Sequence, residues 1–460
     1  MNTRVLRIEL KRSVAPLAGV VILAAALAFL YLIPGLWWSG TAGWTAQWTS
    51  LAMWTRSLLI LLWPIAVGLG ALQGLRDRRS GMYELLTSTP RPARHRAATL
   101  AGATALTLAS AFALLVVVGG VQVVAGTEYM HLGWLPISLV GALSLVAGAV
   151  LGMGVGRALP SALTPPAMAV GAFVFTNLLR VSEASAVPEA AVPNRVSLLS
   201  PAVAQVSEML LTLSASVHVG QTVWLLGMAA TGFALLIAAA PRTRLLALTP
   251  LLAGAAIALL VLPSDPRRTY VVDEAAAAMV CDGPVCVTKA HQARLGDIVG
   301  PGKKALRLLH DALGSQAPVS IRENTALRAS SATLERSRTS VLVDFDDGAI
   351  ADTKGEDLTR AMLAQGMAPH CQPRTAVTRS GMPSETAAQG VAAGWVLGDL
   401  EPLRGTQHRL RDLTALAEPV WKKLKALPRA EQLSRLKAAH AAALSCKADP
   451  LSVLAGGGSP

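Results

Sequence analysis

Residues 134–157 read WLPISLVGALSLVAGAVLGMGVGR, with no charged side chain before the final Arg157. A transmembrane helix needs about 20 consecutive, mostly apolar residues to cross the hydrocarbon part of a bilayer. Six other stretches of the chain have the same character. The sequence therefore predicts an α-helical membrane bundle of about seven transmembrane helices, at residues 14–34, 54–75, 98–126, 134–157, 160–181, 221–240 and 245–263.

Charged residues are scarce and unevenly distributed. Only 15% of the 460 residues are charged, whereas soluble proteins carry about 25%. Residues 1–264 hold 16 Lys and Arg with 7 Asp and Glu, and the remainder holds 25 and 21. We therefore expect a membrane domain at 14–263 and a separate domain at 264–460. The net charge of +13 does not indicate a nucleic-acid partner, because no basic stripe with interleaved aromatic residues is present.

The charges of the short loops predict the orientation of the bundle. Cytoplasmic loops carry an excess of Lys and Arg. One set of loops carries thirteen basic residues, namely Arg4, Arg7, Lys11, Arg12, Arg76, Arg78, Arg79, Arg91, Arg94, Arg96, Arg157, Arg242 and Arg244. The opposite set carries three, Arg56, Arg180 and Arg195. We therefore expect a cell-membrane protein with a cytoplasmic N-terminus. The tryptophans near the outer ends of the first two spans fit the membrane interface, and they are Trp37, Trp38, Trp44, Trp48 and Trp54.

The first apolar run follows a basic segment and could imitate a secretory signal peptide. Its apolar stretch is longer than that of a signal peptide, and no small-x-small cleavage site follows it. We therefore expect the run to remain in the protein as the first span. Seven spans that begin inside leave residues 264–460 outside the cytoplasm.

All four cysteines lie in the C-terminal domain, at Cys281, Cys286, Cys371 and Cys446. An even number of cysteines in one extracytoplasmic domain indicates two disulfides. Cys281 and Cys286 flank a short turn, and a bond between them would leave Cys371 to pair with Cys446 and hold the last helix. The alternatives are four unrelated buried thiols or a metal site, but ligands spaced this widely are weak support for a metal.

The loop between the second and third spans has a distinctive pattern. Gly81 interrupts a basic segment, and the residues after it form one apolar face of a short helix that ends at Ser88-Thr89-Pro90. A short amphipathic helix at the membrane surface can dock into a groove of a partner protein. The alternative is a solvated basic loop that only fixes the orientation.

This loop resembles the cytoplasmic loop of ABC-2-type transporter permeases. The matching residues, in order, are Arg79, Gly81, Glu84, Leu85, Leu86, Ser88 and Pro90. The segment before the first span, residues 1–13, is similar to the family's amphipathic helix on the inner membrane face, and the long outer loop at 182–220 has a counterpart between the fifth and sixth spans. The resemblance covers residues 1–240.

The resemblance implies the membrane subunit of an ATP-binding-cassette exporter. The matched loop would be the coupling helix that contacts a separate ATPase subunit, which would bind ATP and Mg²⁺, and the permease would act as a homo- or heterodimer in the lipid membrane. The family usually has six spans with a cytoplasmic C-terminus. The seventh span and the tail depart from this pattern, so the role of residues 264–460 does not follow from it.

Three glycines recur at every fourth position of the fourth span, at Gly148, Gly152 and Gly156. Small residues at this spacing allow two membrane helices to approach closely. The sequence leaves open whether they pack within the bundle or form a dimer interface.

The C-terminal domain is predicted to be mainly α-helical, with some strand (α+β). Residues 339–345 read as a strand, and residues 303–313, 406–427 and 431–444 read as amphipathic helices.

No enzyme is predicted, and no cofactor or metal is expected in this chain. The segment at 296–304 does not match a phosphate-binding loop, because its spacing is wrong and no Ser or Thr follows the lysine. No carboxylate or histidine lies in the core of a predicted span, which argues against an ion-coupled carrier. The alternative function is a non-transporting anchor that presents an extracytoplasmic sensor, receptor or assembly domain.

Overall fold

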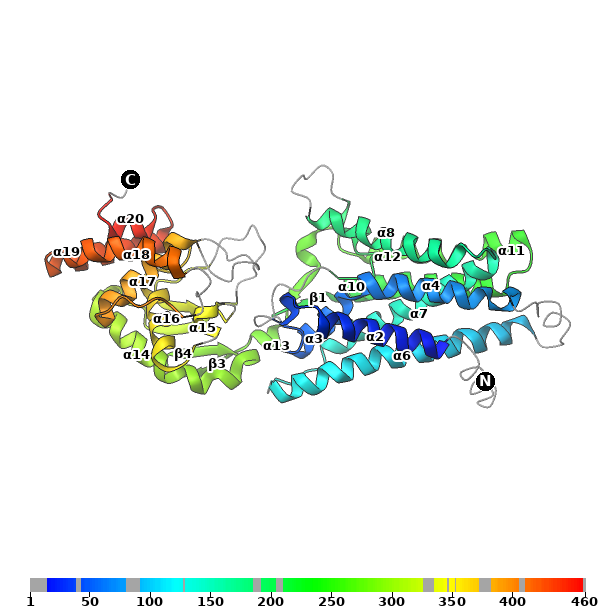
Figure 1. The fold of residues 1–460 in the computed structure, drawn as a ribbon, viewed down its shortest axis with the longest axis horizontal. Helices are drawn as coiled ribbons and strands as arrows, with labels where there is room; N and C mark the ends of the chain where they lie inside the picture. The colour runs from blue at the N-terminus through cyan, green and yellow to red at the C-terminus, as the bar shows by residue number, and fades with distance from the viewer. Residues whose placement is uncertain are drawn as a thin grey trace. The chain divides into compact units, whose positions relative to one another are not determined.

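Each of the seven apolar runs forms a helix (Figure 1). The computed structural model describes residues 15–38, 43–79, 92–126, 129–184, 192–203, 210–325, 335–345, 347–351, 353–371, 382–404 and 410–457. The helices of these runs are α2 (Ala15–Leu32), α4 (Leu59–Arg79), α6 (Ala93–Gly126), α7 (Trp134–Ala158), α8 (Thr164–Ala184), α10 (Ala215–Ile237) and α12 (Thr249–Val261).

Six helical segments are long and apolar enough to cross a membrane. They are Ala15–Leu32, Leu59–Arg76, Ala93–Gly126, Trp134–Ala158, Ala215–Ile237 and Pro241–Val261, the last of which joins α11 (Pro241–Leu246) to α12. The apolar part of α8, Thr164–Leu179, is shorter. The prediction of a membrane-type helical bundle is confirmed for these six segments.

Large apolar side chains cover the outside of the helices. Leu139, Val121, Val170, Leu252 and Leu260 are all exposed. A water-soluble protein rarely exposes so much contiguous apolar surface, whereas the lipid tails of a bilayer are as apolar as these side chains. The surface therefore suits a lipid environment.

The contacts divide the chain into two units. The first, called the bundle here, comprises residues 1–126 and 130–271, and the second, called the C-terminal unit, comprises residues 127–129 and 272–460. Each unit has its own hydrophobic core.

Close contacts fix the direction of each bundle helix. α2 and α6 run parallel, because Gly19 lies against Thr107 and, farther along, the Gln122 amide donates a hydrogen bond to Tyr31. α6 and α7 run antiparallel, because Thr104 contacts Met153 and Phe112 lies against Gly141. These pairs place α2 and α6 in one direction and α7 in the other.

The remaining helices continue this alternation. α4 runs parallel to α7, with Gly70 against Ala149 and Gly74 against Met153. α8 runs antiparallel to α4, with Ala169 against Gly68 and Phe175 against Trp63 at a ring-centroid distance of 6.1 Å.

α10 runs parallel to α7, because Arg56 contacts both Gly141 and Gln221 at one end, while Gly154 lies against Gly232 farther along. α12 runs antiparallel to α10, with Leu262 against Gly220 and Gly254 against Gly227. All seven helices therefore alternate in direction along the chain.

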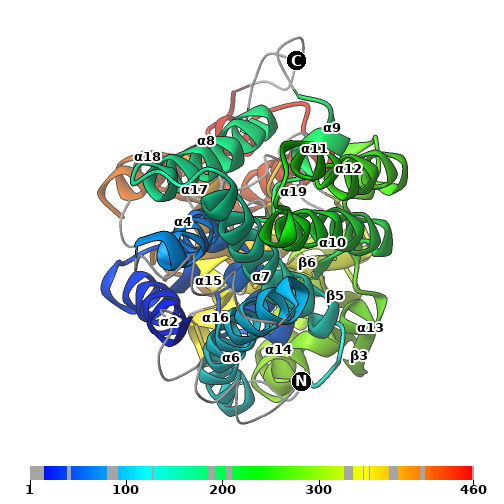
Figure 2. The ribbon, with the colours of Figure 1, turned by 90° about the vertical axis from the view of Figure 1, so that its right-hand side faces the viewer.

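α7 is the central helix of the bundle. Viewed along the helices in Figure 2, it lies among α4, α6 and α10. Of an 18-residue apolar stretch, 61% is buried in α7, against 17% in the segment that contains α12. The helix with which the sequence analysis began is thus the one that the others pack around.

The helix boundaries differ from the prediction where the backbone breaks inside an apolar run. The predicted second span began at residue 54, but residues 54–57 belong to α3 (Trp48–Ser57) and α4 begins only after Leu58. α10 begins at Ala215, six residues before the predicted start, so that His218 lies within the helix. The first break follows the polar residues Thr55, Arg56 and Ser57, which the prediction included in the span.

Short elements lie at the end of the bundle where α2 ends and α4 begins. They are η1 (Leu36–Trp38), α9 (Asn194–Ser197) and the two-stranded sheet of β1 (Leu211–Leu213) with β2 (Tyr270–Val272). Aromatic rings pack edge to face there, with Trp44 at 5.7 Å from both Tyr31 and Trp38. Trp48 stacks on Trp134 at 5.0 Å.

A four-stranded sheet organises the C-terminal unit, in the order β3-β4-β5-β6. β3 (Met279–Asp282) and β4 (Val285–Thr288) form an antiparallel hairpin, while β5 (Ser320–Glu323) and β6 (Ser340–Val343) run parallel to β4. Gly283 makes the hairpin turn with a φ of +60°, which glycine adopts without strain. The predicted strand at 339–345 corresponds to β6.

Helices cover this sheet and complete the unit. α14 (Leu295–Leu313) joins β4 to the parallel β5, and α16 (Gly355–Met367) packs against α14 and β6, where Gly366 contacts Leu309 and Val341. The other helices are α13 (Glu274–Ala277), α15 (Gly348–Ala351), α17 (Pro383–Leu397), α18 (Leu410–Lys425), α19 (Arg429–Ser445) and α20 (Pro450–Leu454). The three predicted helices correspond to α14, α18 and α19, although α14 begins eight residues earlier than predicted.

Candidate functional site

The predicted coupling loop joins α4 to α6. α4 ends at Arg79, and Gly81, Glu84, Leu85, Leu86, Ser88 and Pro90 lie outside the described residues, as does the predicted amphipathic helix at 1–13. The flanking helices place the loop at the end of the bundle where α2 begins, because α4 runs opposite to α2 and α6 runs parallel to it.

The same end of the bundle is basic. Arg76, Arg94, Arg96, Arg157, Arg242 and Arg244 lie where α4, α7 and α10 end or where α6 and α12 approach. The guanidinium of Arg244 donates to the carbonyl oxygen of Ala158 at 3.0 Å, which links α11 to the end of α7. The opposite end carries the aromatic cluster. The two ends therefore differ in the way that the charge pattern predicts for the two faces of a membrane protein.

The three glycines of the fourth span face α4 within the same bundle. A methyl group on Gly152 would lie 2.1 Å from the carbonyl oxygen of Val67, and one on Gly156 would lie 2.3 Å from that of Ala71. Gly148 packs against the indole of Trp63 in the same way. The two backbones can approach this closely only because these positions have no side chain. Of the two readings left open by the sequence, the described contacts are those of packing within the bundle.

Arg56 is the polar residue that the sequence analysis placed wrongly. It was counted as a charge in an outer loop, but it belongs to α3 and is 0% exposed. Its Nη2 donates to the carbonyl oxygen of Pro201 at 2.9 Å and to Oε1 of Gln221 at 2.8 Å. No described carboxylate pairs with it, and its Nη1 is buried without a hydrogen-bond partner. An arginine inside a predicted span was the signal available in the sequence.

Arg56 belongs to a network that holds the segment after α9. Nε2 of Gln221 donates to the carbonyl oxygens of Leu198 and Ser200, at 3.0 and 3.2 Å. The indole of Trp224 donates to the carbonyl oxygen of Leu199 at 3.1 Å. Four consecutive carbonyl groups, at 198–201, thus receive donors from α3 and α10. A buried segment without regular structure needs such partners, and we call this network the Arg56 clasp.

A small cavity lies in the interior of the bundle, among the described residues. It has a volume of about 10 Å³ and lies between α2, α4, α6 and α7, beside Ala18, Gly70, Thr104 and Ala149. That space holds at most one water molecule.

Both predicted disulfides are present. Cys281 and Cys286 join adjacent strands of the β3–β4 hairpin, with their Cα atoms 4.1 Å apart. Cys371 and Cys446 are 75 residues apart in sequence and join the segment after α16 to the end of α19. Among the described residues, no group of three or more His, Cys, Asp or Glu side chains could hold a metal.

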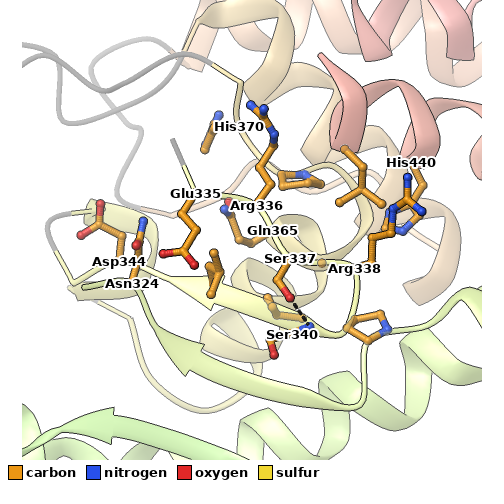
Figure 3. Close-up of a pocket in the computed structure, with 16 residues that line it drawn as sticks. Asn324, Glu335, Arg336, Ser337, Arg338, Ser340, Asp344, Gln365, His370 and His440 are labelled. Carbon is orange, nitrogen blue, oxygen red and sulfur yellow. Dashed lines mark hydrogen bonds between the residues drawn. The ribbon is translucent and has the colours of Figure 1, made fainter. Parts of the chain in front are cut away.

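The C-terminal unit contains a polar pocket with a volume of about 40 Å³ (Figure 3). The segment that leads into β6 lines one side, with Arg336, Ser337 and Arg338. The end of α16 and the residues after it contribute Gln365 and His370, and α19 contributes His440. The volume is sufficient for about three water molecules, or for a ligand group of a few heavy atoms.

Each pocket histidine uses one ring nitrogen within the protein. Nδ1 of His370 lies 3.2 Å from a carboxylate oxygen of Glu385, and Nδ1 of His440 donates to the carbonyl oxygen of Met367 at 3.0 Å. Burial of His440 lowers its pKa, an effect that the hydrogen bond to Met367 opposes. His440 is therefore neutral at neutral pH.

Comparison with known proteins gives no relative. No family model, no curated protein and no solved structure matches this chain.

Proposed function

We propose that this chain is the membrane-spanning subunit of an ATP-binding-cassette exporter. In this proposal Arg79–Pro90 is the coupling helix that docks on a separate ATPase subunit, which binds ATP and Mg²⁺. The observation that carries the proposal is the loop motif itself, with its Gly81, Glu84-Leu85-Leu86 and Pro90, between two helix ends at the basic end of the bundle.

The helix directions support seven crossings. α7 and α10 run in the same direction, so the chain has to return across the bundle between them, and α8 is the long helix described in that interval. α8 has 21 residues, which corresponds to a length of about 31 Å, close to the thickness of about 30 Å of a bilayer core. The coupling loop and the C-terminal unit then lie on opposite sides of the membrane, cytoplasmic and extracytoplasmic respectively.

The transport pathway is proposed to lie between two copies of the chain or between this chain and a related one. The cavity described between α2, α4, α6 and α7 has room for at most one water molecule. The outer end has to open for a substrate to leave, and there the Arg56 clasp holds residues 198–201 against α3 and α10. We propose that this clasp rearranges during transport.

The coupling proposal is tested by copurification. The tagged chain is expressed with the ATPase encoded nearest to it and purified in detergent, and the wild type is compared with a Glu84→Arg, Leu85→Asp double variant. A control with the same two kinds of change, Glu189→Arg with Ala191→Asp, alters the opposite end of the bundle. We expect the ATPase to coelute with the wild type and the control, and to be lost from the coupling variant.

The second candidate function is a non-transporting anchor. It is favoured by the separate core of the C-terminal unit, which spans the sheet and its covering helices. If no ATPase coelutes with either the wild type or the control, the transporter proposal is wrong and the anchor function replaces it.

A further inference from the structure

The disulfide between Cys371 and Cys446 lies in unusual surroundings. Cys446 caps the C-terminal end of α19 with a φ of +53°, and it is the one described non-glycine residue with a positive φ. That conformation normally favours glycine. Both cysteines are half-buried rather than enclosed in the core. A thiol from solution can therefore approach the bond.

A guanidinium group contacts one of the two sulfurs. Nη1 of Arg336 lies 2.8 Å from Sγ of Cys446. When a disulfide is attacked by a thiolate, the sulfur that leaves acquires a negative charge, and a neighbouring arginine stabilises that charge. Arg336 therefore favours Cys446 as the leaving sulfur and Cys371 as the sulfur that is attacked.

The other cysteine is held by a buried carboxylate. Glu385 is 7% exposed, and its two oxygens lie 3.2 Å from the backbone nitrogen of Cys371 and 3.2 Å from Nδ1 of His370. This pair of contacts fixes Cys371 in place, and it brings an imidazole to the residue next to the sulfur that would be attacked. An imidazole at that position can accept or donate a proton during exchange.

The polar pocket lies beside this disulfide, although neither cysteine lines it. Arg336 and His370, which flank the disulfide, also line the pocket, together with Leu444 from the last turns of α19. Its volume of about 40 Å³ accommodates a group as small as a cysteine side chain. Figure 3 shows Arg336 and His370 at the same side of this pocket.

The other disulfide has no such guanidinium contact among the described residues, although Cys281 is exposed. Cys281 and Cys286 are cross-strand neighbours, and the charged side chain beside them is Asp282, which pairs with Lys303 at 3.0 Å. No described cationic side chain donates a hydrogen bond to either of these sulfurs. Cys281–Cys286 can therefore serve as an internal control for the rate of disulfide opening.

We propose that Cys371–Cys446 is a site of thiol–disulfide exchange with a dithiol. A thiolate of the dithiol attacks Sγ of Cys371, the S–S bond breaks, and its electron pair goes to Sγ of Cys446 beside Arg336. The second thiol of the dithiol attacks the mixed disulfide and releases Cys371. The two protons of the dithiol end on the two cysteines, so that this chain is reduced and the dithiol is oxidised. The inference rests on the C-terminal unit alone and does not depend on the transport proposal.

The experiment compares the two disulfides in the full-length protein in detergent. The protein is incubated with dithiothreitol for different times, free thiols are alkylated, and each cysteine pair is quantified by mass spectrometry. We expect Cys371–Cys446 to open at least about tenfold faster than Cys281–Cys286, since a charge-assisted hydrogen bond has this order of effect. With glutathione, a monothiol, we expect the adduct on Cys371 rather than on Cys446.

Variants of the two pocket arginines test whether Arg336 causes the faster opening of Cys371–Cys446. Arg336→Gln is expected to slow the opening of Cys371–Cys446 about tenfold, and Arg336→Lys, which keeps the charge, to slow it less. Arg338→Gln removes the same charge from the same pocket but contacts neither sulfur, so it should have no effect. The opening rate of Cys281–Cys286 in each sample reports whether the fold is intact. If Arg336→Gln alters that rate, the comparison of Arg336→Lys with Arg338→Gln decides whether Arg336 accelerates the opening of Cys371–Cys446.

Two results would overturn the proposal. One is equal opening rates for the two disulfides in the wild type. The other is equal rates for the Arg336 variants and Arg338→Gln, which would mean that Cys371–Cys446 is a purely structural bond.

Discussion

Arg56 illustrates how a single buried cation organises one end of the bundle. Its guanidinium has two acceptors, the carbonyl oxygen of Pro201 and the amide oxygen of Gln221, and no described carboxylate. Burying a charge without a counter-ion is costly. We therefore infer that an arginine is present here because of the segments that it links. It connects α3 and α10 to the segment at 198–201.

Replacing Arg56 should release this segment. Hydrogen bonds to charged groups contribute about 2 kcal/mol, so Arg56→Gln is expected to increase the opening of the segment roughly thirtyfold. The measurement is the rate of trypsin cleavage after Arg195, in α9, on the purified full-length protein. Arg267→Gln removes an exposed charge from the same end of the bundle and is the control. Equal cleavage of both variants would contradict the role assigned to Arg56.

His440 makes the stability of the C-terminal unit depend on pH. Burial lowers the pKa of His440 in the folded protein, so the unfolded chain binds the extra proton more readily. The free energy of unfolding therefore falls as the pH drops below about 6.5, the ordinary pKa of histidine, and is unaffected above it. His440→Asn, which retains a donor for Met367 but cannot be protonated, should lose less stability on acidification.

This difference is measured as the thermal unfolding midpoint of the full-length protein at pH 7.5 and pH 5. The wild type should lose more than His440→Asn between the two values. His310→Asn, at an exposed position on α14, is the control and should behave like the wild type. An identical pH dependence for all three proteins would contradict the role of His440 in the pH dependence of stability.

At the scale of the helix, close approach between α4 and α7 holds the centre of the bundle. Gly152→Leu would drive a side chain into the carbonyl group of Val67, which lies 2.1 Å from a Cβ at that position. Overpacking of this kind costs about 1–3 kcal/mol or more. Gly171→Leu in α8, where nothing lies within 4 Å, should be tolerated. The readout is the temperature at which each variant aggregates in detergent, and equal temperatures would show that α4 and α7 do not need this contact.

α8 carries the most direct test of the number of spans. If α8 crosses the membrane, a cysteine at Ser161 reacts with an impermeant maleimide only from the cytoplasmic side, and one at Ala186 only from the outside. The native cysteines form disulfides and should not react. Labelling of both positions from the same side would show that α8 does not cross.

Elements that depend on local pattern were predictable, and contacts across the chain were not. All seven apolar runs form helices, because 18 or more apolar residues in sequence have few alternatives in a membrane. The break at Leu58 was missed because the polar residues at 55–57 were included in the predicted span, and the break at Leu248 because it lies within the apolar run 245–263. The two disulfides followed from a count of four cysteines and one short spacing.

The sites depend on residues that are distant in sequence. Arg56 meets Pro201 at a separation of 145 residues, and Arg336 meets Cys446 at a separation of 110. No periodicity or motif connects such positions. The predicted coupling loop differs from these sites. Its motif could be recognised in the sequence, but its residues after Arg79 lie outside those the structure describes.

The proposed function of the whole molecule requires that the two ends of the bundle face opposite sides of the membrane. The alternation of seven helices places the start of α2 and the coupling loop at one end, and the exit from α12 at the other. A coupling loop can meet a cytoplasmic ATPase, and disulfides can persist in the C-terminal unit, only if these ends lie on opposite faces.

The most direct test is protease protection of two epitope tags, one inserted between Thr87 and Ser88 and one after Pro460. Protease is added to intact cells or spheroplasts and, separately, to inverted membrane vesicles. With seven spans, we expect the C-terminal tag to be lost only from cells or spheroplasts and the loop tag only from inverted vesicles. Loss of both tags from the same preparation would contradict the seven-span arrangement and the coupling proposal that rests on it.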